Sequence, residues 1–331
     1  MKRNRNAVIT LGLLPVLALS TSSAFAQGRT ISGSLDIGVF RGFDKTKNVG
    51  TIQRSNIAFT GGEDLGDGVS ATFALSHRLD IDTGKAEGAG SKPFWQGEST
   101  VGLKSSSWGH LRLGRALDVV SANDWAYDPW YNFDRIASPA WNNWHWNYAS
   151  DRTSNTGSAE YGRLSDGLFY DSPSFNGITV HLSGSFENDS TTPGAGTGNN
   201  GGVSLNYDQG PVSLMLASSK NRSGDTVLFA GAKYTIGAFD LMGAYDKSVF
   251  KAATDSTAKV YTLGAVYRIG AASLKAGYGH RDVDGAKTKF IGLGANYALS
   301  KRTSVYVSLG NNRPDGADNA TAYGVGVTHS F

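Results

Sequence analysis

The sequence contains no cysteine, which excludes disulfide frameworks, thiolate catalysis and cysteine-bound metals. This absence suits a chain that passes through an oxidising compartment before it folds. The six histidines show no spacing typical of a metal site, so we expect neither a metal nor a cofactor. No triad of serine, histidine and carboxylate is recognisable either, and we do not expect an enzyme.

Long hydrophobic runs are lacking once the first residues are set aside. Residues 1–26 combine a positive start, a short apolar stretch interrupted by Pro15, and a small-x-small triplet that ends at Ala26. These features predict a cleaved secretion signal. After Gln27 no segment approaches the ~18 consecutive apolar residues of a membrane-spanning helix. We therefore expect a signal peptide over residues 1–26 and one folded domain over residues 27–331.

An excess of one charge is also lacking in the expected mature chain. The full sequence has 31 Lys and Arg residues against 28 Asp and Glu residues, and Lys2, Arg3 and Arg5 lie in the expected signal. Cleavage leaves 28 basic against 28 acidic residues. Overall charge therefore gives no reason to expect a nucleic-acid partner. Any electrostatic function must come from the local grouping of charges.

Alternation of apolar and polar residues is the dominant pattern after residue 27. In the segment 30–40, for example, Leu35, Ile37 and Val39 occupy one face and Asp36 the other. A period of two predicts β-strands that present one face to an apolar environment. Similar segments recur along the whole chain, separated alternately by short turns, such as residues 61–68, and long polar loops, such as residues 247–258 and 311–319. Counting them gives about sixteen strands, which is enough to enclose an aqueous lumen.

The chain ends on the same alternation. Tyr323, Val325 and Val327 lead to a terminal aromatic residue, Phe331. A final strand that ends in an aromatic residue, in a chain with a secretion signal, points to the bacterial outer membrane. We interpret these four residues as an assembly signal. The sequence thus predicts an all-β fold, a transmembrane antiparallel β-barrel with short periplasmic turns and long external loops.

Six segments in a fixed order carry a family resemblance. They are residues 56–66, 101–104, 109–115, 170–175, 297–303 and 324–331. Together they resemble the general porins of Gram-negative bacteria, of the β-proteobacterial type, over essentially the whole mature chain. The resemblance implies a homotrimer of sixteen-stranded barrels in contact with outer-membrane lipid, lipopolysaccharide and the insertion machinery. It also implies that the third external loop folds into the lumen.

The same resemblance implies a constriction where arginines on the barrel wall face acids on that loop. Motif matching places Arg54, Arg115 and Arg163 on the wall. Arg54 has the parity of the polar side of its strand, and an arginine facing lipid at mid-depth would cost ~2–4 kcal/mol. Arg78 and Arg112 share the lumen parity and would extend this basic wall. An alternative interpretation is that these arginines only form salt bridges within the wall, and the two can hold together.

The expected loop, residues 118–162, is rich in acidic and aromatic residues. The acids expected to contribute to the constriction are Asp118, Asp124, Asp128 and Asp134. The tryptophans are Trp125, Trp130, Trp141, Trp144 and Trp146. These aromatic residues have two interpretations. They could form a stacking surface for a sugar or an aromatic acid, or they could anchor the loop against the barrel wall or a neighbouring subunit.

The function expected from these features is passive diffusion of small hydrophilic solutes and ions. The arginines converge on one wall, whereas the acids are dispersed over some forty residues, so we expect a weak to moderate preference for anions. The alternative is a solute-specific channel that uses the tryptophans of the loop. A smaller barrel with enzymatic activity would need a catalytic cluster, which the sequence does not offer.

Overall fold

The computed structural model describes residues 28–88, 93–145, 162–186, 200–221, 224–251 and 254–331. The expected signal peptide, residues 1–26, lies outside the described residues, as does Trp146. No helix in the described part of the chain is long and apolar enough to cross a membrane.

The described residues form one antiparallel sheet with two very short helices. The elements in chain order are β1 (Arg29–Arg41), β2 (Lys47–Gly50), β3 (Asn56–Gly66), β4 (Val69–Asp80), β5 (Lys85–Ala86), β6 (Glu98–Ser105), β7 (Gly109–Leu117), η1 (Asp124–Tyr127), α1 (Pro139–Asn143), β8 (Arg163–Asp171), β9 (Ile178–Ser185), β10 (Asn200–Gln209), β11 (Val212–Lys220), β12 (Thr226–Ile236), β13 (Phe239–Phe250), β14 (Ser256–Ile269), β15 (Ala272–Val283), β16 (Ala286–Ala298), β17 (Thr303–Pro314) and β18 (Ala320–Ser330). β2 and β5 are short strands within loops, and the other sixteen strands are long.

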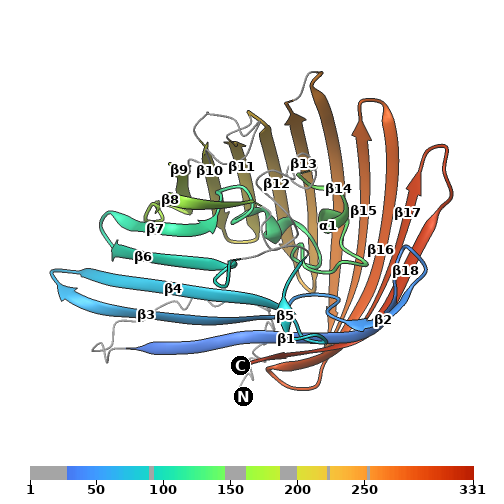
Figure 1. Cartoon of the computed structure of the whole chain (residues 1–331), viewed down its shortest axis with the longest axis horizontal. Helices are drawn as coiled ribbons and strands as arrows, with labels where there is room; N and C mark the ends of the chain where they lie inside the picture. Colours follow the sequence, from blue (N-terminus) through green and yellow to red (C-terminus); the bar gives the residue numbers. More distant parts are fainter. Residues whose placement is uncertain (1–27, 89–92, 146–161, 187–199, 222–223, 252–253) are drawn as a thin grey trace, which may run out of the picture.

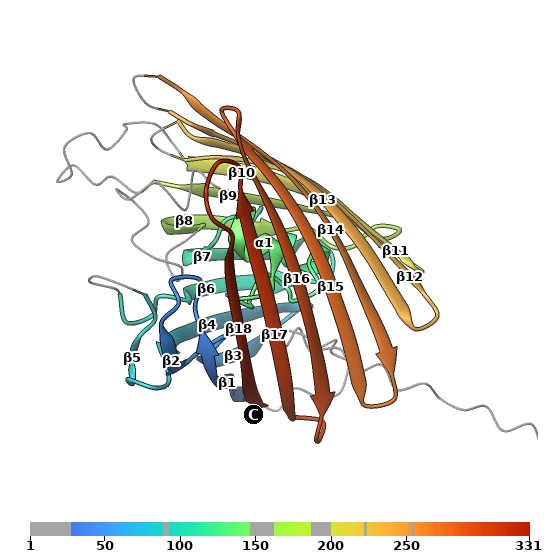
Figure 2. The same ribbon diagram turned by 90° about the vertical axis from the view of Figure 1, so that its right-hand side faces the viewer.

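The sheet closes on itself through β1. The first half of β1 pairs with β3, and its second half pairs with β18. At this closure Ile37 lies opposite Val327, and Val39 lies opposite Val325. Figures 1 and 2 show strongly tilted strands arranged in a ring. The prediction of a closed all-β barrel with about sixteen strands is confirmed.

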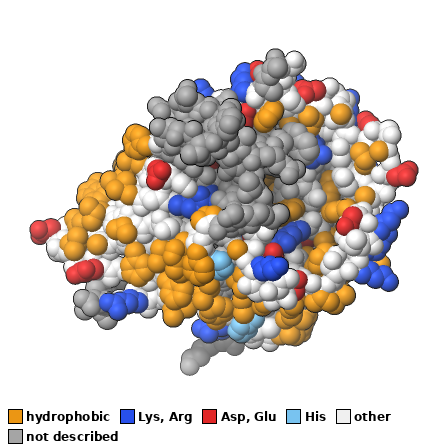
Figure 3. Space-filling view, viewed as in Figure 1, with side chains coloured by type: hydrophobic (Ala, Val, Ile, Leu, Met, Phe, Trp, Pro, Cys, Tyr) orange, Lys and Arg blue, Asp and Glu red, His pale blue; other side chains and the backbone are white. Residues whose placement is uncertain are grey.

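Side chains alternate between the two faces of the barrel wall. On β12, Val227 and Phe229 are fully buried on the lumen side, whereas Leu228 between them is 42% exposed on the outside. Figure 3 shows apolar side chains gathered on the outer surface over the strands at the lower left of the view. Phe239 and Tyr267 stack at 4.5 Å near short turns, where an aromatic girdle is expected. The wall is therefore apolar toward lipid.

Strand ends differ from the sequence-based expectation at both rims. Residues 61–68 are expected to be a turn, but β3 continues to Gly66 and only Asp67 and Gly68 turn. Both have positive φ (51° and 72°), the backbone of a tight two-residue hairpin. At the other rim, the expected loops 247–258 and 311–319 shrink to 251–255 and 315–319. Strands that extend beyond the membrane lose their apolar alternation, so the sequence pattern resembles that of a loop.

Candidate functional site

The described part of the chain that follows β7, residues 118–145, folds into the lumen, as predicted. Figure 1 shows α1 inside the ring of strands. Trp144 packs edge-on against Phe229 of β12 with ring centroids 4.9 Å apart, and its Nε1 donates to Thr262 of β14 at 3.2 Å. Tyr127 joins the same buried cluster. An inserted loop needs apolar anchorage, and this cluster provides it.

Two glycines of the wall let the loop backbone lie directly against β16 and β17. A Cβ atom at Gly292 would be 1.8 Å from the carbonyl oxygen of Ala137. A Cβ atom at Gly310 would be 1.9 Å from the carbonyl oxygen of Ile136. Any larger residue at either position would displace the loop. Part of the loop's position is therefore set by residues that have no side chain.

The four acids of the loop that were assigned to the constriction are buried by contacts within the loop and, for Asp134, also by the Ser308 hydroxyl of β17. Asp118, Asp124, Asp128 and Asp134 are each 2% exposed or less. Asp128 accepts hydrogen bonds from the backbone N–H groups of Trp130, Asn132 and Ala140 and from the Ser138 hydroxyl. Burial raises the pKa of Asp128 to about 6, although these hydrogen bonds oppose the rise. These carboxylates build the loop, which differs from the expectation that some of them face the lumen.

A buried histidine joins the loop to the wall. His145 Nε2 lies 2.5 Å from Asp124 in the loop, and Nδ1 lies 2.5 Å from Asp246 on β13. Burial alone would lower the pKa of His145, but the two carboxylates raise it to about 10. Both ring nitrogens therefore carry protons at neutral pH, and the imidazolium forms an ion pair on each side. We call Asp124, His145 and Asp246 the latch. The spacing of the histidines in the sequence did not predict it.

Arginines from several segments gather on the wall that faces the loop. Arg54, between β2 and β3, lies over the ring of Phe133 in the loop at 4.4 Å. Burial, followed by the charges of Arg78 and Arg163, lowers the pKa of Arg54. A guanidinium nevertheless stays protonated at physiological pH. Arg163, the first residue of β8, also donates from Nε to the carbonyl oxygen of Gly97 at 2.9 Å.

A fourth arginine of this group comes from the loop. Arg135 was not predicted from the sequence. It reaches Glu87 at 2.7 Å and Asp80 at 3.4 Å. Glu87 also lies 2.5 Å from Nε of Arg78, so this buried carboxylate links the wall to the loop. We call Arg54, Arg78, Arg135 and Arg163 the basic cluster.

The remaining two predicted arginines have separate surroundings. Arg115 lies at a β-bulge of β7 and donates to the Ser165 hydroxyl at 2.7 Å. Arg112 binds Glu98 at 2.9 Å and Asp171 at 3.0 Å, toward the short-turn end of β7. Arg112 thus has the wall salt bridges that the alternative interpretation describes. It is not part of the basic cluster.

Comparison with known proteins identifies the family of this barrel. The sequence profile described as Gram-negative porin matches residues 14–317. The chain belongs to the Gram-negative porin family. Outer membrane porin protein 32 of Delftia acidovorans is 30% identical over 318 residues, covering 89% of this chain and 87% of the relative. Major outer membrane protein P.IB of Neisseria meningitidis is 28% identical and covers 98% of each chain.

Solved structures agree with this assignment. The structure titled "Anion-selective porin from Comamonas acidovorans" superposes with a TM-score of 0.78 at 26% identity, covering 92% of this chain and all of that one. OmpT of Vibrio cholerae in its trimer form superposes with a TM-score of 0.70 at 12% identity, which shows a shared fold. This porin is therefore a channel-forming barrel of the Gram-negative outer membrane.

The four described tryptophans of the porin's loop fall into two groups. Trp130 and Trp144 are 4% exposed and pack between the loop and the wall. Trp125 and Trp141 are half-buried, and the Arg135 guanidinium lies 5.8 Å from the Trp141 ring. Trp125 also donates from Nε1 to the carbonyl oxygen of Ala122 at 2.7 Å, and its ring centroid lies 5.9 Å from that of Tyr131. No metal-binding group of side chains is present in the part of the porin that the structure describes.

Proposed function

We propose that this porin is a passive channel for small hydrophilic solutes and ions with a weak to moderate preference for anions. The observation that carries the proposal is an imbalance of charge beside the loop. Three guanidinium groups of the basic cluster, those of Arg54, Arg78 and Arg135, meet two carboxylates, Glu87 and Asp80. The acids assigned to the constriction are buried within the loop. Within the described residues the cluster therefore has a positive excess.

Arg54 contributes most directly to this excess. Its contact is an aromatic ring, its Nε is buried without a hydrogen-bond partner, and no carboxylate pairs with it within the described residues. A charge that no carboxylate neutralises attracts anions most strongly where low-dielectric walls confine the water. The Comamonas porin that superposes on this chain is named an anion-selective porin, which agrees with this preference.

Replacing Arg54 with alanine tests the proposal. We expect the reversal potential in a KCl gradient across a planar bilayer to move toward cation preference, because the least neutralised charge of the cluster is removed. Arg302→Ala is the matched control, since it removes the same charge from an exposed turn residue. The control should leave the reversal potential unchanged. Equal shifts in the two variants, or none in Arg54→Ala, would refute the role of the cluster.

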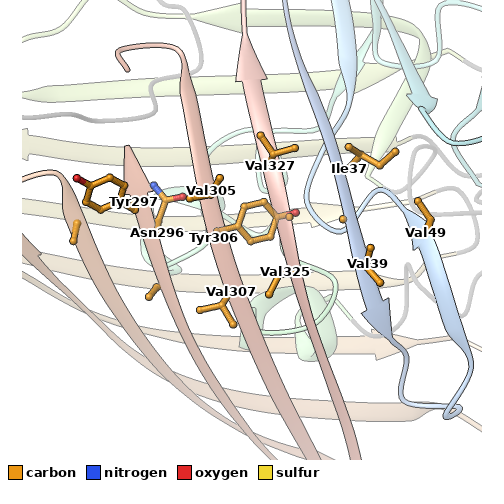
Figure 4. A pocket seen from close by; sticks show the side chains of 14 residues that line it. Ile37, Val39, Val49, Asn296, Tyr297, Val305, Tyr306, Val307, Val325 and Val327 are labelled. Carbon is orange, nitrogen blue, oxygen red and sulfur yellow. The ribbon is translucent and has the colours of Figure 1, made fainter. Parts of the chain in front are cut away.

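We further propose that the porin, after removal of residues 1–26, assembles as a homotrimer in contact with lipid and lipopolysaccharide. An apolar groove of ≈ 790 Å³ crosses the outer face of β1, β2 and β16–β18, and Val39, Val49, Val305, Val307, Val325 and Val327 are among its lining residues (Figure 4). We assign this groove to a second copy of the barrel, because continuous apolar depressions suit close packing between proteins. A monomeric mass for the protein extracted in mild detergent would refute the assignment.

Deleting Phe331 should reduce the fraction of folded protein. Its backbone N–H and C=O each form a 3.1 Å hydrogen bond with Gly33, and its ring lies over that glycine. The residue also ends the strand that we propose the insertion machinery recognises. The folded fraction is measured as the band that shifts on heating in gel electrophoresis. Phe331→Tyr keeps the ring and should fold normally, whereas normal folding of the deletion variant would contradict the assignment.

A further inference from the structure

One buried carboxylate on β1 lies where the barrel closes. Asp36 is fully buried on the polar face of the strand. Its Oδ1 accepts hydrogen bonds from the backbone N–H groups of Ile52 at 2.8 Å and Gln53 at 2.7 Å. Its Oδ2 accepts from the hydroxyls of Tyr306 at 2.6 Å and Thr328 at 2.7 Å. One side chain therefore connects β1, β17, β18 and the segment 51–55.

The backbone of Asp36 holds the same segment. Its carbonyl oxygen accepts from the hydroxyls of Thr51 at 3.2 Å and Ser55 at 3.1 Å, and its N–H donates to Ser55 Oγ at 2.9 Å. Segment 51–55 has no regular secondary structure. Its backbone N–H groups at Ile52 and Gln53 donate hydrogen bonds to the Asp36 carboxylate. The position of this segment therefore depends on Asp36.

The positions of two arginines of the basic cluster depend on segment 51–55. Arg54 is part of it. Arg135 donates its backbone N–H to the carbonyl oxygen of Ile52 at 3.0 Å. The Ile52 side chain is buried in one apolar cluster with Ile136 and Tyr306. A shift of segment 51–55 would thus move one cluster residue directly and a second one through the loop.

We propose that Asp36 is a positioning residue for ion selectivity, which it sets by fixing segment 51–55 and with it Arg54 and Arg135. This inference rests on the proposed anion preference. It predicts a change in anion preference opposite in sign to the one expected from charge alone. Deleting a negative charge near a channel raises its anion preference if only electrostatics act. If Asp36 acts by position, its deletion lowers the anion preference instead, because the arginines are no longer held.

The test compares three variants by reversal potential in a KCl gradient. The loss of anion preference in Asp36→Ala should be more than half as large as the loss in Arg54→Ala. Asp36→Asn should keep it, since its amide oxygen can accept from the two backbone N–H groups while the hydroxyls of Tyr306 and Thr328 rotate to accept from its NH₂. Tyr306→Phe combined with Thr328→Val removes only the contacts to the barrel strands and should also keep the preference.

Hydrogen exchange gives a readout independent of selectivity. The peptide that contains Ile52 and Gln53 should exchange faster in Asp36→Ala than in the wild type or in Asp36→Asn. The double variant Asp36→Ala/Arg54→Ala should lose less preference than the sum of the single losses, because both changes act on one element. If Asp36→Ala does not fold, Thr51→Val with Ser55→Ala removes the three hydrogen bonds between the Asp36 backbone and segment 51–55 without changing a charge, and should shift the potential in the same direction.

The outcomes separate this inference from the function on which it rests. An unchanged or increased anion preference in folded Asp36→Ala, while Arg54→Ala loses preference, would overturn the positioning role alone. An equal rise of the anion preference in Asp36→Asn and Asp36→Ala would also overturn it, because the lost charge rather than the position of the arginines would then be responsible. No effect of Arg54→Ala would overturn the proposed function itself.

Discussion

Deleting residues 124–143 and joining the ends with a short Gly-Ser linker is expected to raise the single-channel conductance several-fold. These residues include η1, α1 and the two cluster residues Tyr127 and Ala140, all of which lie in the lumen. The sixteen long strands pair with one another and do not need the loop to close the sheet. The barrel should therefore remain folded while its narrowest section widens, and conductance follows the open cross-section.

A matched replacement separates the loop from a general effect of loop surgery. Replacing residues 315–319, an exposed connection between β17 and β18, with Gly and Ser leaves the lumen unchanged. Its conductance should equal that of the wild type. A conductance of the 124–143 deletion that also equals the wild type, measured in the same planar bilayers, would show that the loop does not obstruct the path of ions.

Raising the pH through about 10 is expected to loosen the third loop, because the His145 ion pairs are then lost. The two carboxylates that bind the imidazole raise the pKa of His145 to about 10, against ~6.5 for a free histidine. A raised pKa stabilises the folded loop fully below pH ~6.5, and this contribution disappears as the pH rises through the folded value. Burial also raises the pKa values of the neighbouring Asp118 and Asp124. The latch therefore holds at neutral pH and fails in alkali.

Open-channel current noise reports this loosening. Wild-type channels should be quiet at neutral pH and noisy above pH ~10, with transitions to states of higher conductance. His145→Ala should be noisy already at neutral pH and change little in alkali. His181→Ala is the control, since His181 pairs with Asp171 on the wall and touches no described part of the loop. Identical noise in His145→Ala and the wild type at every pH would show that the latch does not hold the loop.

The strands could be predicted from the sequence because each one repeats a simple period. Lipid on one side and water on the other force alternation, as Val227, Leu228 and Phe229 show. The same rule gave the lumen-facing parity of Arg78 in β4, whereas Arg54 precedes β3 in a segment without regular structure, where strand parity does not apply. It could not find the limits of strands beyond the membrane, where both faces are polar. The insertion of the loop came from the family resemblance, since no period marks it.

The site was harder to predict because it is built from irregular segments. Arg135, Glu87 and His145 lie in loops, where spacing says nothing about direction. Each loop carboxylate can be hydrogen-bonded either by backbone N–H groups or by water in the lumen. The sequence does not show which of the two holds. Asp36 did carry a signal, because aspartate is depleted within strands and its presence there suggests a specific set of donors.

The interpretation of the loop aromatic residues as a stacking surface for a solute is open to experiment. Trp125 and Trp141 are half-buried and lie outside the buried apolar cluster of the loop. Stacking of a sugar or an aromatic acid on them would block the current in a concentration-dependent way. The proposed general channel passes such solutes without block.

The most direct test of the account is the reversal potential of the wild-type porin in KCl gradients of increasing ionic strength. Screening by salt shortens the Debye length from ~10 Å at 0.1 M to ~3 Å at 1 M. We predict a weak to moderate anion preference at low salt that declines as the salt concentration rises, because the excess charge of the basic cluster is its source. A clear cation preference at low salt would contradict the account, since acids other than Glu87 and Asp80 would then control the narrowest section.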